Sequence, residues 1–322
     1  MASCGVQILL WVIMAVLVTL ILSFMVFYLY LISYRQGFIN EFDDQFNQFC
    51  DSLPPITYRR AVYIPFENGV YEKRLATALL DISFNTTKAN CTNVLPIPNP
   101  PKFNNQLRVE GPDPITHQQS MFAYIFWNRG LCHACISFTG TETVAEWQSN
   151  VQFEQVAPTS LNGYTSGVLV HKGFYNIYLS IRNQLWDWWN KNSWVKTLYI
   201  TGHSLGAALS TICAYDFADV FVEDDCDTES IKPIHYSFAA PRSGNVKYSR
   251  VFTVRMPTSL RINNTEDIIP QLPPATFRGY TYEQTRGSIP FTISLGSLKQ
   301  DHVEAYAFSL PECAQVADCY VE

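Results

Sequence analysis

An uncharged, strongly apolar run of residues lies near the N-terminus of the 322-residue chain. Residues 8–32 contain no Asp, Glu, Lys or Arg, and a helix of that length would be about 37 Å long, enough to cross a hydrocarbon core of ~30 Å. No Lys or Arg precedes Arg35, and no small-x-small cleavage site ends the run, so the pattern favours an uncleaved anchor over a signal peptide. We expect a single-pass membrane anchor over residues 1–34, followed by one domain over residues 35–322.

Beyond this run, the apolar positions predict alternating helices and strands. Residues 173–191 carry apolar side chains at intervals of three and four, the spacing that lines one face of a long helix. Further helices are predicted over residues 38–50, 71–84 and 205–219, and strands over residues 121–127, 131–138, 194–200, 234–238, 259–262 and 291–294. The alternation predicts an α/β fold with a mainly parallel central sheet flanked by helices on both faces. The Asn- and Pro-rich residues 86–114 are predicted to form an exposed loop.

Composition and charge exclude some classes of partner and cofactor. Hydrophobic residues make up 48% of the chain, which is enough for a sizeable core. The net charge is −6 and no run of Lys or Arg occurs, so no nucleic-acid partner is expected. Cys132 and Cys135 have a metal-like spacing, but on a strand their side chains would point to opposite faces. We therefore expect no metal and no other cofactor.

Cysteines and glycosylation sequons favour a lumenal or extracellular location for the large domain. Eight cysteines follow the apolar run, an even number that is compatible with disulfide bonds. Cys313 is expected to pair with Cys319, or one of these two with Cys50. Asn85 and Asn90 open two Asn-x-Thr sequons and are the candidate glycosylation sites.

Ser204 is the candidate nucleophile. It lies in Gly202-His203-Ser204-Leu205-Gly206, between a predicted strand and a predicted helix. A Gly-x-Ser-x-Gly pattern in that context is typical of the strained turn that presents a serine in α/β-hydrolases, because the tight turn leaves no room for side chains at the two glycines. The alternative, a serine in an ordinary glycine-marked turn, is less favoured in this context.

A serine nucleophile needs a histidine base and an acid that orients it, in the chain order Ser, acid, His for this fold. Only His235 and His302 follow Ser204. His235 lies within a predicted core strand, whereas His302 follows a loop near the end of the chain, so His302 is the candidate base. For the acid, Asp267 and Glu266 both follow the predicted strand 259–262, at the edge of the sheet where sites of α/β proteins lie. Asp267 is the favoured candidate and Glu266 is the alternative.

Two groups are expected to stabilise the negative charge that develops on the substrate oxygen. One is the backbone N–H of Leu205, directly after the candidate nucleophile. The other is Thr141, in a Gly-Thr turn that ends the predicted strand 131–138 and can offer both a backbone N–H and a hydroxyl.

These segments together resemble the fungal-type, or class 3, lipase family. The resemblance covers roughly residues 75–308 and rests on segments 138–141 (Phe-Thr-Gly-Thr), 170–174 (Val-His-Lys-Gly-Phe), 202–206, 240–244 (Ala-Pro-Arg-Ser-Gly), 264–274 and 301–302 (Asp-His). It implies an α/β-hydrolase fold, hydrolysis of acyl esters of glycerolipids and a lipid ester substrate at a membrane or lipid surface. Ser204, Asp267 and His302 fall on the family's catalytic triad.

The resemblance also assigns the remaining parts of the site. Thr141 and Leu205 fall on the oxyanion donors, and residues 142–149, with Val144 and Trp147, fall on the lid that opens at a lipid surface. The family's usual second glycine after the nucleophile is Ala207 here. Two alternatives stay open: a phospholipase or acyltransferase that uses the same catalytic residues, and a catalytically silent, membrane-anchored binding protein.

Overall fold

The computed structural model describes residues 71–92, 97–114, 117–140, 153–223, 228–231, 233–308 and 310. The predicted membrane span, the helix predicted over 38–50, the predicted lid with Val144 and Trp147, and Thr141 all lie outside these residues, as do Cys50, Cys313 and Cys319. In the ranges described, no helix combines the length and the apolar character that a membrane crossing requires.

The fold is organised around a seven-stranded sheet. In spatial order its strands are β1 (Asn105–Pro112), β2 (Gln119–Asn128), β3 (His133–Phe138), β6 (Thr197–His203), β9 (Ile234–Phe238), β10 (Ser259–Asn264) and β13 (Ser288–Phe291). The strands from β3 to β13 are parallel, and β1 and β2 pair antiparallel at one edge. The predicted mainly parallel sheet is therefore confirmed.

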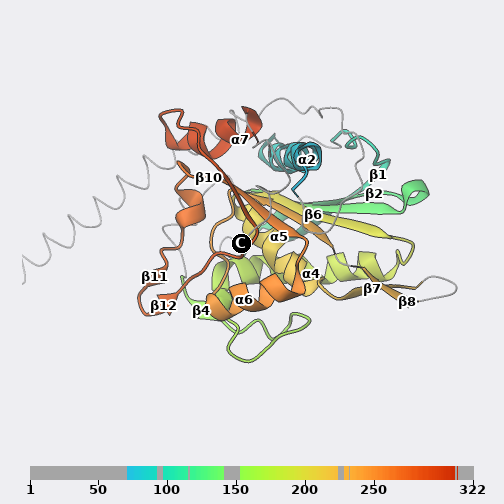
Figure 1. Cartoon of the computed structure of the whole chain (residues 1–322). Coiled ribbons are helices and arrows are strands. Elements are labelled where there is room, and N and C mark those ends of the chain that lie inside the picture. The colour runs from blue at the N-terminus through green and yellow to red at the C-terminus, as the bar shows by residue number, and fades with distance from the viewer. Residues whose placement is uncertain are drawn as a thin grey trace, which may run out of the picture.

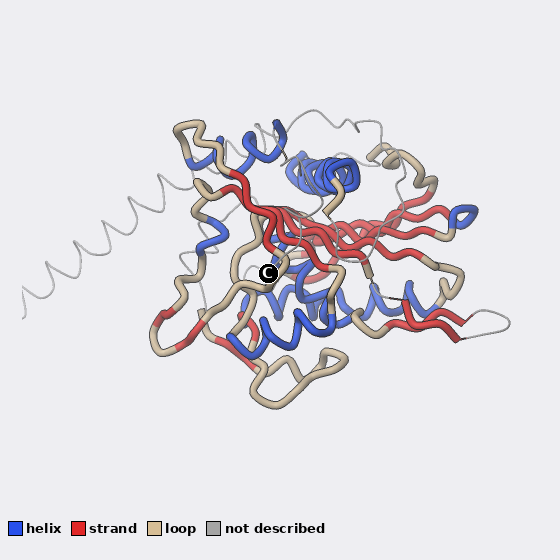
Figure 2. Tube along the Cα trace, in the orientation of Figure 1, coloured by secondary structure: helices blue, strands red, loops and turns tan. Residues whose placement is uncertain are grey.

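Helices cover both faces of this sheet (Figures 1 and 2). On one face lies α2 (Lys73–Thr92), and near it lies the C-terminal turn formed by a π-helix (Gln300–Glu304) and α7 (Ala305–Phe308). On the other face lie α4 (Lys172–Asn190), α5 (Leu205–Asp216) and α6 (Val246–Arg255). Each face buries its own apolar layer, with Phe138, Phe174 and Leu209 in the α4–α5 layer and Leu80, Phe238 and Tyr306 in the α2 layer.

Short elements complete the chain and leave the sheet undisturbed. Three two-stranded ribbons pair β4 (Gln155–Val156) with β5 (Val170–His171), β7 (Val220–Glu223) with β8 (Thr228–Ile231), and β11 (Thr276–Phe277) with β12 (Tyr280–Thr281). A single turn of 3-10 helix, Arg129–Leu131, follows β2, and another, Ile269–Gln271, follows β10.

The prediction of an exposed loop over residues 86–114 is wrong for two parts of that segment. Residues 86–92 continue α2, and residues 105–112 form β1, whose register with β2 is interrupted by one bulge. The polar residues Thr86 and Thr87 suggested a solvated loop, but both side chains are buried and hydrogen-bond inside the protein. The polar residues at the start of this segment therefore belong to a helix whose buried face carries hydroxyl groups.

The same helix overturns Asn85 as a glycosylation site. Asn85 is only 3% exposed and lies in the middle of α2, so the folded domain has no room for a glycan on its amide. Asn90, five residues further along α2, is half-buried and stays a candidate. Of the cysteines described, Cys132, Cys135 and Cys213 are free thiols, and burial raises the pKa of Cys135 and Cys213.

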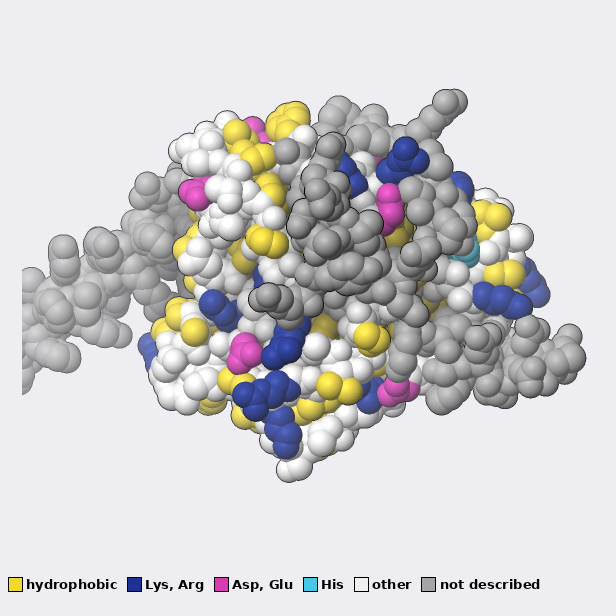
Figure 3. All heavy atoms as spheres, viewed as in Figure 1, with side chains coloured by type: hydrophobic (Ala, Val, Ile, Leu, Met, Phe, Trp, Pro, Cys, Tyr) yellow, Lys and Arg dark blue, Asp and Glu magenta, His cyan; other side chains and the backbone are white. Residues whose placement is uncertain are grey.

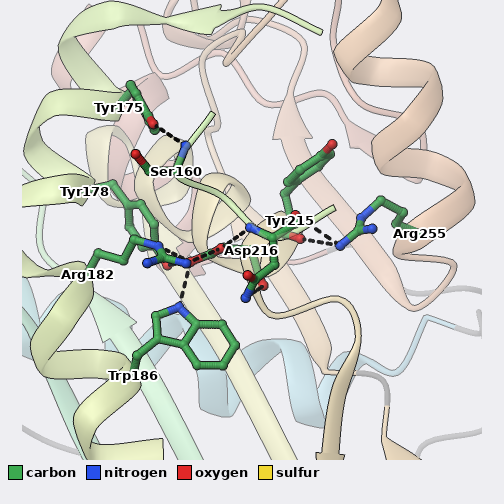
Figure 4. A network of polar contacts seen from close by, with 9 residues as sticks. Ser160, Tyr175, Tyr178, Arg182, Trp186, Tyr215, Asp216 and Arg255 are labelled. Carbon is green, nitrogen blue, oxygen red and sulfur yellow. Dashed lines mark hydrogen bonds and ion pairs between the residues drawn. The ribbon is translucent and has the colours of Figure 1, made fainter. Parts of the chain in front are cut away.

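A buried carboxylate holds the far end of α5, the helix that follows the candidate nucleophile. Asp216 accepts hydrogen bonds from Tyr178 Oη (2.8 Å), Trp186 Nε1 (2.7 Å) and Arg182 Nε (2.8 Å), all from α4 (Figure 4). Its other oxygen accepts from the backbone N–H of Asn162 at 2.7 Å. This network joins α5 to α4 and so fixes the direction in which α5 leaves the sheet.

Charge is distributed unevenly over the surface. In the view of Figure 3, Lys and Arg side chains gather in the lower part of the face, over the region of α6, which contributes the exposed Lys247 and Arg250. The acidic excess of the whole chain therefore does not extend to this part of the surface.

Candidate active site

Ser204 lies in a strained turn between β6 and α5. Its backbone has φ 59° and ψ −126°, a conformation that side-chain-bearing residues adopt only under constraint. A Cβ atom on Gly202 would lie 2.2 Å from the carbonyl oxygen of Gly206, and one on Gly206 would lie 2.5 Å from the carbonyl oxygen of Phe138. Gly202 is therefore needed for the chain to turn here, as the sequence pattern predicted, and Gly206 is needed for the end of β3 to pack against the turn.

The turn places the Ser204 hydroxyl at the N-terminus of α5. The backbone N–H of Ser204 donates to the carbonyl of Phe238 on β9 (3.0 Å), which ties the turn to the neighbouring strand. The Ser204 side chain is buried, and no described residue forms a hydrogen bond with its Oγ. Leu205 begins α5, so its backbone N–H belongs to the positively polarised end of a helix. That end suits an oxygen that becomes negatively charged during a reaction.

Asp267 and His302 come together from segments that are 35 positions apart in the chain. Asp267 Oδ2 lies 2.8 Å from His302 Nδ1, and both side chains are about fully buried, with 0% and 1% exposed. Since the carboxylate accepts from Nδ1–H, the neutral ring presents Nε2 as its acceptor nitrogen. Glu266, the alternative acid, is exposed. The geometry therefore selects Asp267 and His302 as the acid–histidine pair.

Tyr306 also contacts this pair, and sequence analysis missed it. Its hydroxyl donates to Asp267 Oδ2 (3.1 Å) and accepts from the backbone N–H of Asn264 (2.8 Å), while Asp267 Oδ1 accepts from the N–H of Ile269 (2.9 Å). Burial first, and then the Asp267 carboxylate, raise the pKa of Tyr306 well above its usual value, so its hydroxyl stays protonated as a donor. Its position four residues after His302 would have been a signal if that segment had been predicted as helical.

His203 supports the segment that carries His302. Its Nε2 lies 2.8 Å from the carbonyl oxygen of His302, and because a carbonyl only accepts, Nε2 is the donor. The two rings lie 4.7 Å apart, and Phe84 and Tyr306 pack edge-on against His203. Burial, and then the neighbouring His302, lower the pKa of His203 well below its usual value, so the ring is neutral.

Two other histidines have structural contacts, which was the expectation for His235. His235 is buried between Ser210 Oγ (3.0 Å) and Ser259 Oγ (2.7 Å), and burial lowers its pKa to about 3. His171 caps the N-terminus of α4 by accepting from the N–H of Phe174 at 3.3 Å, and burial lowers its pKa to about 3 as well.

The oxyanion side of the site is described up to Gly140, the residue before the predicted donor Thr141. The N–H of Gly140 donates to Thr87 Oγ1 of α2 at 2.9 Å. Within the described part of the chain, no three His, Cys, Asp or Glu side chains are grouped so that they could hold a metal ion. The structure brings together the acid and the histidine, and it holds Ser204 next to His203, which contacts His302, but among these described residues it shows no hydrogen bond from Ser204 Oγ to that pair. A serine, a histidine and an orienting acid are the residue types of acyl transfer.

Part of the chain matches a known family of proteins. Residues 135–277 match the family model described as lipase (class 3). The chain is 33% identical over 153 residues to phospholipase A(1) DAD1 of Arabidopsis thaliana, covering 43% of this chain and 33% of that protein. It is 30% identical over 146 residues to the lipase of Rhizomucor miehei, covering 44% of this chain and 38% of that protein. The chain thus spans about a third of the length of these curated relatives.

A solved structure supports the same fold. The propeptide complex of Rhizomucor miehei lipase, as a deletion mutant, superposes with a TM-score of 0.51 over 70% of this chain and 69% of that one. The sequence identity in that comparison is 20%, so the similarity concerns the fold.

Proposed function

We propose that the protein is a serine lipase of the class 3 family that hydrolyses acyl esters of glycerolipids. The match of residues 135–277 to the class 3 lipase model, the lipase and phospholipase relatives and the α/β-hydrolase fold support this proposal. The observation that carries the proposal is the buried contact between Asp267 and His302. The backbone of His302 is hydrogen-bonded by His203, the residue before a serine held in a strained turn at a helix N-terminus. Ester hydrolysis by this group of residues needs no cofactor.

The proposed reaction has two steps. Ser204 Oγ attacks the ester carbonyl carbon while its proton passes to His302 Nε2, and Asp267 stabilises the imidazolium through Nδ1–H. The oxyanion of the tetrahedral intermediate accepts from the N–H of Leu205 and from Thr141. The alcohol then leaves with the proton from His302. Water attacks the acyl-enzyme by the same route in reverse, which releases the fatty acid and restores Ser204.

Replacing the nucleophile tests this reaction. Ser204→Ala is expected to lower kcat for a soluble p-nitrophenyl ester by roughly 10³-fold or more, because the variant keeps only binding and oxyanion stabilisation. A fluorophosphonate probe should label the wild-type protein and fail to label the variant. Ser210→Ala is a matched control, since Ser210 is another buried serine, six residues further along in α5, and its hydroxyl contacts His235.

Two outcomes would contradict the proposal. Full esterase activity in Ser204→Ala would exclude Ser204 as the nucleophile. No labelling of wild-type protein in a detergent-treated sample would favour a catalytically silent binding protein.

The names of the relatives favour a second substrate class. The curated proteins that resemble this chain include a phospholipase A(1) and a galactolipase of Arabidopsis thaliana as well as a fungal lipase. We therefore propose that phospholipids compete with triacylglycerols as substrates. A panel of both lipids with product analysis separates the two, and transfer of the acyl group to an added alcohol would identify an acyltransferase.

We further propose that residues 8–32 anchor the protein in a membrane, with residues 35–322 on the lumenal or extracellular side. The length and uncharged character of that run support the anchor. An anchor would keep the site close to lipid substrates. Extraction with carbonate and digestion by protease of sealed microsomes test the proposal: release by carbonate would refute the anchor, and digestion of residues 35–322 in intact vesicles would refute the orientation.

A further inference from the structure

Helix α2 directs a row of three hydroxyl groups toward the sheet. Ser83 Oγ lies 3.1 Å from Thr201 Oγ1 on β6, and Thr86 Oγ1 donates to Ser137 Oγ on β3 at 2.9 Å. Both contacts join side chains and hold the helix to the strands. The third hydroxyl, on Thr87, bonds instead to the main chain just beyond the end of β3, at Gly140. Thr87 is therefore the one member of the row that acts on backbone beside the candidate active site.

The Thr87 hydroxyl is held in a single orientation. It donates to the carbonyl of Ser83 (3.0 Å), one turn earlier in α2, and it accepts the N–H of Gly140 at 2.9 Å. All three residues are buried, so water is a poor substitute for either partner. The bond from Gly140 thus attaches this backbone to a rigid helix.

The same backbone packs against the turn around Ser204 on its other side. The carbonyl oxygens of Phe138 and Thr139 lie so close to Gly206 that a Cβ there would meet them at 2.5 Å and 2.8 Å. A Cβ on Gly140 would lie 3.4 Å from Thr87 Cγ2 and 3.6 Å from the carbonyl oxygen of His203. Residues 138–140 therefore lie between α2 and the turn that carries the candidate nucleophile.

We propose that Thr87 is a positioning residue for the oxyanion side of the active site. By accepting the Gly140 N–H, it sets the distance between the backbone after β3 and the Ser204 turn. This inference rests on the proposed function, because the distance matters only if an oxyanion forms there. It also gives the Asn85-Thr86-Thr87 sequence a role inside the fold.

Three variants test the proposal. Thr87→Val keeps the shape but removes the acceptor, and we expect kcat for a soluble p-nitrophenyl ester to fall by about tenfold or more with KM unchanged, since a misplaced donor costs less than the roughly 10²–10³-fold of a deleted one. Thr87→Ser keeps the hydroxyl and should remain within about threefold of wild type. Thr86→Val is the matched control: it removes the neighbouring buried hydroxyl of the same helix and should lower the melting temperature without a comparable loss of kcat.

A second measurement does not depend on activity. Hydrogen exchange of the peptide that contains Gly140 should be faster in Thr87→Val than in Thr86→Val or Thr87→Ser. Equal loss of kcat in Thr86→Val and Thr87→Val, wild-type kcat in Thr87→Val, or unchanged exchange at Gly140 would each overturn the positioning role. If wild-type protein showed no Ser204-dependent activity, the proposed function would fail first, and the assignment of Thr87 would fail with it.

Discussion

Replacing the carboxylate of Asp267 by an amide tests the proposed chemistry most directly. In the wild-type site Oδ2 accepts from His302 Nδ1 and from Tyr306 Oη, and Oδ1 accepts from the N–H of Ile269. The side-chain amide of an Asp267→Asn variant has only one oxygen for these three donors. If that oxygen keeps the N–H of Ile269, the amide NH₂ faces His302 and the ring must turn its Nδ1 lone pair toward it. The proton then sits on Nε2, which can no longer accept from Ser204.

The expected loss is large and specific. In the Ser-His-Asp template the same change lowers kcat by about 10⁴-fold, which corresponds to about 5 kcal/mol of transition-state stabilisation. We expect a comparable loss of kcat on a soluble ester, with KM within about threefold, because Asp267 does not touch substrate in the proposed mechanism. Labelling by a fluorophosphonate should slow in parallel, because it uses the same proton transfer.

The neighbouring acid provides the control. Glu266→Gln changes the same charge one residue earlier on an exposed side chain, and its kcat should match wild type. An Asp267→Asn enzyme that kept more than about a tenth of wild-type kcat would refute the orienting role. Equal losses in the two variants would show that charge near the site, rather than the contact with His302, controls the rate.

Three further predictions concern other parts of the structure. Tyr306→Phe removes one donor from Asp267 and should lower kcat on a soluble ester by about tenfold, since the carboxylate that orients His302 loses a hydrogen bond; wild-type kcat would contradict this. Asp216→Ala should destabilise the domain by about 3 kcal/mol in urea unfolding, because it leaves the partly buried Arg182 and two other α4 donors without their acceptor; a change below about 1 kcal/mol would count against the network. Burial lowers the pKa of His235 to about 3, whereas in the unfolded chain a histidine has a pKa of ~6.5. As pH falls below ~6.5, the unfolded chain therefore takes up a proton at His235 that the folded protein does not. The free energy of unfolding should fall by about 1.4 kcal/mol per pH unit from this residue until pH approaches 3, and should be unaffected by it above pH ~6.5. Urea unfolding at several pH values should show that the free energy of unfolding falls less steeply with decreasing pH in His235→Gln than in wild type. Equal slopes in the two proteins would contradict the lowered pKa of His235.

Features that depend on near neighbours in the chain could be predicted from the sequence. The long helix of residues 173–191 is α4 within one residue at each end, and the strand predicted over 234–238 is β9, because side-chain periodicity is a local property. The turn around Ser204 was also predictable, since the Gly-x-Ser-x-Gly pattern is local and the clash that requires Gly202 is with the carbonyl oxygen of Gly206, four residues on. The clash that requires Gly206 is with the backbone at the end of β3 and became visible only in the fold. The chain order Ser, acid, His then limited the candidates that follow Ser204, and Asp267 and His302 were chosen from these as the acid and the base.

Tertiary structure decided which polar residues are buried and what they contact. The hydroxyls of Thr86 and Thr87 suggested a solvated loop, yet they dock α2 on the sheet, because a hydroxyl is tolerated in a core when a partner lies opposite it. Likewise, sequence analysis did not identify Tyr306, which lies in α7 and contacts Asp267 in the loop after β10, because these two segments meet only in the fold. Local sequence therefore determined most of the helices and strands and the turn around Ser204. The hydrogen-bond partners of the buried polar side chains lie tens of positions away in the chain, so only the tertiary structure decided them.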